Sequence, residues 1–140
     1  MAIYGIGAFQ GTDVSQEFIQ RSVIYIGWGC EEARELEQFL RVLRPGDIVY
    51  IKSCSPRSHY ISVKAIGLVT DAQPFKIGDD CWARNVRWFD ANPFLIQKPI
   101  EKNNVRYNTM YEEFHPDVQS AIFDSVLSCE KGSGEKMSAK

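Results

Sequence analysis

Three tryptophans, Trp28, Trp82 and Trp88, supply the side chains best suited to holding a flat ligand. An indole ring stacks on a nucleobase with ~1–3 kcal/mol per base, and two such rings can enclose a base that has left its helix. Trp28 ranks first because Gly27 and Gly29 beside it leave its surroundings open. The alternative for each ring is a packed position in the core with its N–H group bonded.

Asp13 adds a carboxylate at the start of a helix that the sequence predicts over residues 13–21. A carboxylate can accept a hydrogen bond from the exocyclic amine of a base, or it can cap the helix and do nothing more. With Asp13 included, the predicted base pocket consists of Asp13, Gly27, Trp28, Trp82 and Trp88.

Cations and hydroxyl groups gather where a predicted strand ends and the next begins. Hydroxyls and cations suit phosphate oxygens, and a guanidinium can make two parallel hydrogen bonds to one phosphate. The alternative is an ordinary solvated hairpin tip. The predicted contacts to a nucleic-acid backbone are Lys52, Ser53, Arg57 and Lys64.

Catalytic and metal-binding patterns find little support in this chain. Neither His59 nor His115 has a carboxylate or nucleophile at a spacing that defines a triad, and no phosphate-binding loop is present. The four cysteines lie far apart without a Cys-x-x-Cys pair, which argues against a zinc ribbon. We therefore predict a protein that is not an enzyme and has no metal and no cofactor.

An amphipathic helix and two strands are expected to position these candidates. Apolar residues recur at three- and four-residue spacing from Ala33 to Leu43, which predicts a helix with one buried face. Pro45 and Gly46 end that helix, and two β-type runs follow over 48–51 and 60–69. The segment predicts helix, strand, loop and strand in that order.

Further elements are predicted on both sides of this segment. The glycines in the first strand, Gly5 and Gly7, leave room for another backbone or a ligand to approach closely. The predicted strands cover 2–9, 22–29, 83–89 and either 95–100 or 104–107, and a last helix begins at Pro116.

The pattern over the first two thirds of the chain resembles a known family. Gly11-Thr12-Asp13 precedes Phe18-Ile19, then come Ile26-Gly27-Trp28, the helix, the run 45–53 and the run 63–69. This arrangement resembles the EVE-like branch of the PUA superfamily, most closely the N-terminal domain of McrB-type, modification-dependent restriction proteins. The resemblance implies an α+β fold, a PUA-like bent β-barrel of about five to six strands with flanking helices. It also implies nucleic-acid binding, in which an aromatic pocket holds one extruded base.

Length and composition bound these expectations. A chain of 140 residues with 44% hydrophobic content supports one domain, predicted over 1–130, and the polar run 131–140 predicts a mobile tail. No apolar run is long enough to cross a membrane and no secretory signal is visible, so we expect a soluble, cytoplasmic protein without a membrane partner.

The charge distribution argues against nonspecific coating of nucleic acid. The net charge is −2, although nine Lys or Arg residues stand against six acids between Asp47 and Tyr107. The leading hypothesis is a module that holds one base, modified or unmodified, with DNA favoured over RNA. A protein-interaction module of a phage or defence locus is the second hypothesis, and a small nuclease on the same fold is the third.

Overall fold

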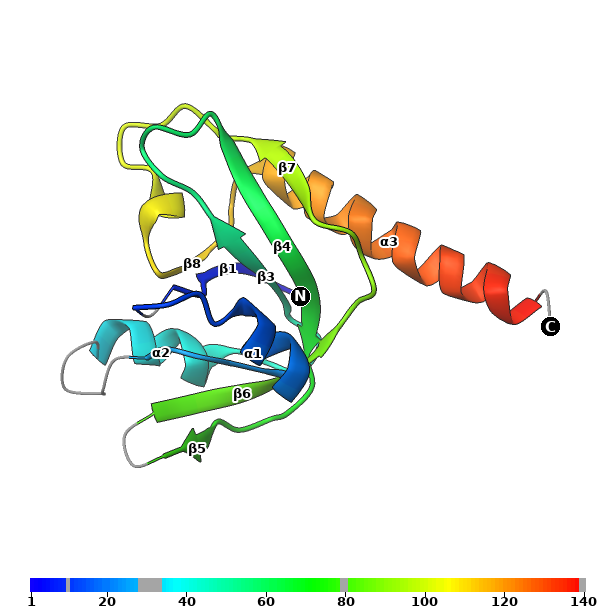
Figure 1. Ribbon diagram of the computed structural model, residues 1–140, viewed down its shortest axis with the longest axis horizontal. Helices are drawn as coiled ribbons and strands as arrows, with labels where there is room; N and C mark the ends of the chain where they lie inside the picture. The colour runs from blue at the N-terminus through cyan, green and yellow to red at the C-terminus, as the bar shows by residue number, and fades with distance from the viewer. Residues whose placement is uncertain (10, 28–33, 79–80, 139–140) are drawn as a thin grey trace.

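The chain folds as an α+β structure around one curled, mixed sheet, as a computed structural model of residues 1–9, 11–27, 34–78 and 81–138 describes it (Figure 1). The strands of these residues are β1 (Ile3–Gly7), β2 (Val23–Tyr25), β3 (Ile48–Ser53), β4 (Tyr60–Val69), β5 (Phe75–Ile77), β6 (Cys81–Trp88), β7 (Phe94–Gln97) and β8 (Met110–Glu112). The helices are α1 (Ser15–Arg21), α2 (Arg34–Val42), α3 (Pro116–Ser138) and the short 3₁₀ helix η1 (Val105–Tyr107).

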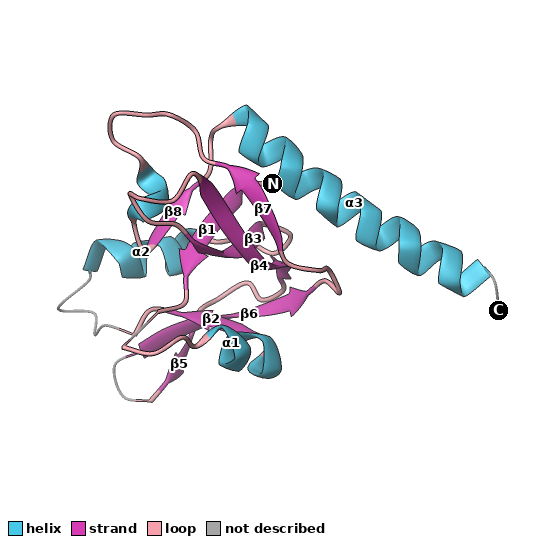
Figure 2. Ribbon diagram, turned by 45° about the horizontal axis from the view of Figure 1, so that its top comes forward, coloured by secondary structure: helices cyan, strands magenta, loops and turns pink. Residues whose placement is uncertain are grey.

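The sheet runs in the order β2-β6-β4-β3-β1-β8, with β5 added on β6 and β7 added on β4. β1 and β3 are parallel, whereas the other pairs are antiparallel. β4 is the longest strand, and it pairs with β3, β6 and β7 along different parts of its length. The sheet therefore curls into a half-barrel, with β2, β5 and β6 forming the layer below β1, β3 and β4 (Figure 2).

Two apolar clusters fill the two faces of the curled sheet. β3 shows the alternation, because Val49 and Ile51 belong to the cluster that contains Phe18 of α1 and Leu40 of α2. Its other residues, Ile48 and Tyr50, belong to the cluster that is covered by Val118, Ile122 and Val126 of α3. β3 is thus buried on both faces, as expected for a central strand.

A β-bulge interrupts the β3–β4 hairpin beside Lys64. Ile51 pairs with Ala65 and Lys52 pairs with Val63, so Lys64 is an extra residue of β4 that pairs with no residue of β3. The bulge reverses the alternation of β4: Ile61 and Val63 lie in the α3-side cluster before it, and Ile66 does so after it.

The turn between α2 and β3 follows the sequence closely. Gly46 has φ of +91°, a value that favours glycine, and the Asp47 carboxylate accepts hydrogen bonds from the backbone N–H groups of Arg44 at 2.9 Å and Ala2 at 3.0 Å. The predicted helix end at Pro45 is confirmed.

Most predicted elements are present, with differences at the short ones. The α+β class, the helices at 13–21 and from Pro116, and the 48–51/60–69 hairpin are confirmed. Of the two alternatives for the last strand, 95–100 is confirmed by β7. β5 and β8 were not predicted, and residues 105–107 form η1 instead of a strand. Each of these three elements has only three residues, too few for a periodic pattern to show.

α3 continues through Ser138 and projects beyond the body of the molecule (Figure 1). Residues 131–138 are therefore helical, where the composition predicts a mobile tail, and the prediction of mobility itself stays a prediction. Of the helices described, none has the length and apolar character needed to cross a membrane.

Candidate functional site

A hollow opens where the parallel strands β1 and β3 end side by side. Gly7 pairs with Lys52 at this edge, and the chain then leaves both strands in loops. The hollow has a volume of ≈ 300 Å³ and is lined by Gly7, Ala8, Phe9, Asp13, Lys52, Ser53, Cys54, Lys64, Tyr107, Asn108 and Thr109. We call it the strand-end hollow. Its lining comes from five separate stretches of the chain.

Lys52 forms part of the lining although its side chain is almost fully buried. By the alternation of β3, Lys52 faces the same side as Tyr50, and its Nζ lies 5.5 Å from the centroid of the Tyr111 ring. The ammonium donates to the backbone carbonyl oxygens of Arg106 at 2.8 Å and Asn108 at 2.6 Å. This overturns the expectation that Lys52 is a solvated cation at the end of a strand, since only 6% of the residue is exposed.

The buried charge of Lys52 is not matched by a carboxylate within ion-pair distance in the described part of the chain. Burial lowers the pKa of Lys52 to about 8, because removal of water disfavours the ammonium form. An ammonium group has three N–H donors, and the two carbonyls accept two of them. One donor is left for whatever enters the strand-end hollow.

Asp13 and Lys64 face each other across the opening of the hollow. Lys64 Nζ lies 3.0 Å from Asp13 Oδ2, and Asp13 Oδ1 accepts from the backbone N–H of Ser15 at 2.9 Å. The Ser15 hydroxyl donates to the same oxygen at 2.5 Å. This bond, the bond from the Ser15 backbone N–H and the Lys64 ammonium lower the pKa of Asp13 to about 2, so the carboxylate stays ionised and acts only as an acceptor. Asp13 thus orders the turn before α1, although the N-cap residue itself is Val14, and it also lines the hollow. Its predicted contact to a base stays a prediction.

Two aromatic side chains of the lining are exposed to solvent. Phe9 is 76% exposed and Tyr107 is 41% exposed. Lys98 Nζ donates to the Tyr107 hydroxyl at 2.8 Å and lies 5.0 Å from the centroid of that ring. The hollow therefore has flat apolar surfaces at its edge, a cation beside one of them, and a donor and an acceptor inside.

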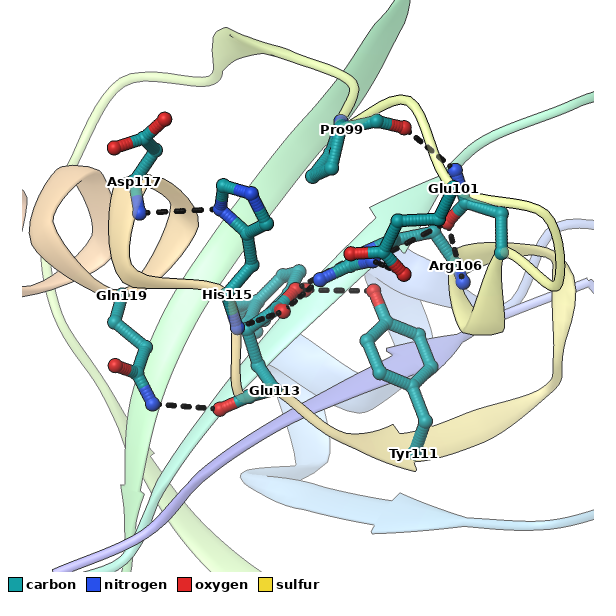
Figure 3. A network of polar contacts seen from close by, with 10 residues as sticks. Pro99, Glu101, Arg106, Tyr111, Glu113, His115, Asp117 and Gln119 are labelled. Atoms are coloured by element: carbon teal, nitrogen blue, oxygen red, sulfur yellow. Dashed lines mark hydrogen bonds and ion pairs between the residues drawn. The ribbon is translucent and has the colours of Figure 1, made fainter.

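The wall carrying Tyr107 is held from behind by a buried polar network (Figure 3). The Arg106 guanidinium pairs with the buried carboxylate of Glu113 and lies 3.1 Å from Glu101 Oε2. The Tyr50 hydroxyl lies 2.8 Å from Glu113 Oε1 and 2.6 Å from the Tyr111 hydroxyl. Burial raises the pKa of both tyrosines, which keeps them neutral. A satisfied network of this kind fixes the position of η1 and β8.

Two of the predicted tryptophans lie away from the strand-end hollow. Trp88 is partly buried against the core, and its Nε1–H donates to the carbonyl of Phe18 at 2.9 Å, which is a structural role. Two cations lie near the Trp82 ring, Arg41 Cζ at 5.7 Å and Lys76 Nζ at 5.2 Å from its centroid.

The remaining predicted residues divide in three ways. Asp13, Lys52, Ser53 and Lys64 meet in the hollow. Arg57 is exposed in the β3–β4 loop and is not part of the lining. Gly27 is exposed, and Trp28, the preferred pocket residue, lies outside the described residues, so the prediction for it stays a prediction.

Sequence reasoning missed the aromatic residues of the hollow, Phe9 and Tyr107. Phe9 could have been recognised as a candidate because it is the last residue of the predicted first strand, which contains two glycines. Tyr107 carries no such signal, since only the tertiary structure brings η1 to the end of β3. No group of three His, Cys, Asp or Glu side chains in the described ranges has the arrangement of a metal site.

Comparison with known proteins adds no assignment: no family model and no curated protein matches the chain.

Proposed function

We propose that the chain binds nucleic acid and holds one base in the strand-end hollow. The observation that carries the proposal is the combination of two exposed rings, Phe9 and Tyr107, with a free donor of Lys52 and the ionised carboxylate of Asp13. A planar base would stack on a ring, and its edge would meet one donor and one acceptor. Cytosine, guanine and adenine each present an exocyclic amino group and a hydrogen-bond acceptor, and so match this pair.

The surroundings of the hollow support contact with a phosphate backbone. Lys64 is partly exposed at its edge, Ser53 is exposed beside it, and Lys98 adjoins Tyr107. Few cations are involved, so binding to ordinary nucleic acid should be weak and selectivity should come from the base. In this proposal the curled sheet is a PUA-like barrel, as the resemblance implies, and DNA is favoured over RNA.

The proposal is tested by equilibrium binding of labelled DNA and RNA oligonucleotides, with one modified or unmodified cytosine, at a single salt concentration. Phe9→Ala should weaken binding about fivefold or more, because ~1–3 kcal/mol of stacking is lost. Tyr60→Ala is the matched control, since Tyr60 is 49% exposed and is not part of the lining. Equal and undetectable affinity for all oligonucleotides, or equal affinity of the two variants, would refute the proposal.

A further inference from the structure

A second and larger concavity lies between α2 and the segment that contains η1 and β8. Its volume is ≈ 1070 Å³, in the range of protein ligand sites. Its apolar lining includes Leu36 and Phe39 of α2, Val105 of η1 and Phe114 after β8. Phe114 is 72% exposed, although a side chain of this size is normally buried. We call this concavity the acidic groove.

The charges along the acidic groove are predominantly negative. Its lining includes the carboxylates of Glu35, Glu101 and Glu112 and a single strong cation, Arg106. Arg106 is only 2% exposed and already pairs with Glu113 and Glu101 (Figure 3). Glu35 and Glu112 are in no ion pair among the described residues, so a ligand in the groove would meet negative charge, which repels phosphates and anionic lipid surfaces and attracts Lys and Arg.

Phe114 also lines a neighbouring depression of ≈ 430 Å³. This second depression adds the apolar side chains of Met1 and Phe123, which are 78% and 39% exposed. Its lining also includes the carboxylates of Glu112 and Asp124. Phe114 thus belongs to two neighbouring depressions whose linings combine exposed apolar side chains with carboxylates.

The groove is pre-formed, which lowers the cost of binding. On one side α2 packs into the core through Leu40. On the other side the Arg106–Glu113 pair holds the η1–β8 segment, and the Asn104 side chain donates to the Pro99 carbonyl at 2.9 Å. Both walls are therefore set before a ligand arrives.

From these observations we propose that the acidic groove docks a protein segment that carries apolar anchor residues flanked by Lys or Arg. The apolar lining and the exposed Phe114 would receive the anchors, and Glu35, Glu101 and Glu112 would meet the cations. This surface is distinct from the strand-end hollow, and the proposal does not depend on nucleic-acid binding.

Three synthetic peptides test the proposal with the full chain. The first has Leu and Phe on one helical face and Lys elsewhere, the second replaces Lys by Glu, and the third replaces Leu and Phe by Ser. We expect the first to bind about tenfold or more tightly than either other peptide at low salt. No binding of the first peptide, or similar binding of all three, would overturn the proposal.

Two variants and a mapping experiment locate the binding. Phe114→Ala should weaken binding of the first peptide at least about fivefold, whereas Leu95→Ala should not, because Leu95 is 61% exposed on β7 and lies outside the lining. In NMR titrations the amides of Phe39 and Phe114 should shift. Shifts confined to other residues would overturn the proposal.

A measurement of molar mass by sedimentation tests whether a second copy of this chain occupies the groove. Self-association that Phe114→Ala abolishes would assign the groove to a second copy of this chain and overturn the proposal. A monomer that binds the first peptide would support it.

Discussion

The strand-end hollow and the acidic groove share one segment, Tyr107–Thr109, whose residues belong to the lining of both. The hollow contains the buried ammonium of Lys52 and the ion pair of Lys64 with Asp13, whereas the groove combines an apolar lining with carboxylates. In the two proposals the hollow receives a nucleic acid and the groove receives a cationic peptide. The comparison teaches that two adjoining surfaces of a small domain can differ in charge even where they share lining residues.

The largest expected effect comes from breaking the wall that both surfaces share. Arg106→Met leaves Glu113 buried without its cation, and we expect a loss of about 3–5 kcal/mol in the free energy of unfolding, measured by urea denaturation. Both binding activities should fall with it. Arg87→Met, at an exposed position of β6, serves as the control and should cost less than about 0.5 kcal/mol. Equal midpoints for the two variants would contradict a structural role of Arg106.

The next prediction separates the two surfaces. Phe9→Ala should lower oligonucleotide affinity by about 5- to 150-fold and leave affinity for the cationic peptide unchanged. Phe114→Ala should do the reverse, because Phe114 lines only the groove and its neighbouring depression. Anisotropy titrations of both variants with both probes check this. A variant that weakens both ligands equally would show that the two surfaces act as one.

A pH titration distinguishes the surfaces more finely. With its pKa near 8, Lys52 is roughly 90% protonated at about pH 7 and roughly 10% at about pH 9, so oligonucleotide affinity should fall up to tenfold over this range. The binding of Lys52→Met should be weak and independent of pH there. A wild-type affinity that does not change between these pH values would exclude the Lys52 ammonium as a donor to the ligand.

Unfolding does not explain that loss of affinity. The pKa of Lys52 is lowered on folding, so between about pH 8 and the ordinary value of 10.5 the unfolded chain holds a proton that the folded chain has released. The contribution of Lys52 to the free energy of unfolding therefore rises with pH in that window. Thermal denaturation at both pH values provides the check.

The smallest effect is expected at Glu37, a buried charge that belongs to neither surface. Its carboxylate is 2% exposed and has no hydrogen-bond partner in the described part of the chain, and burial raises its pKa above 4.5. Glu37→Met should increase the free energy of unfolding at neutral pH by on the order of 1 kcal/mol without changing either binding activity.

The pH dependence of the Glu37 effect has a defined sign. Folding raises the pKa of Glu37, so the protonated carboxyl stabilises the folded wild type at low pH. This contribution to the free energy of unfolding is lost as the pH rises from 4.5 through the raised pKa. The advantage of Glu37→Met should therefore shrink in acid. Gln38→Met, at an exposed position of α2, is the control. An unchanged melting temperature for Glu37→Met at neutral pH would contradict a destabilising effect of the buried Glu37 carboxylate.

Local features of the sequence predicted much of the fold, and four of the eleven residues that line the hollow were among the predicted site residues. The Pro45–Gly46 turn and the β3–β4 hairpin follow from backbone preferences and alternation, which act between near neighbours. The burial of Lys52 does not follow in this way, because the carbonyl groups that receive it belong to a segment far along the chain. Trp88 was predicted to contact a ligand, but its indole N–H donates a hydrogen bond to the Phe18 carbonyl within the protein.

The central position of β1 has a consequence for how the chain acquires its structure. β1 lies between β3 and β8, with Ile3 opposite Ile48 and Tyr4 opposite Glu112. During synthesis β1 is made before both neighbours, so its hydrogen-bonding edges are unsatisfied until β3 and then β8 have been translated. Such long-range pairings are typical of domains that fold in milliseconds to seconds. Until residues 110–112 have been made, β1 lacks one of its two partners, and an unpaired strand edge in the nascent chain is open to association with other chains.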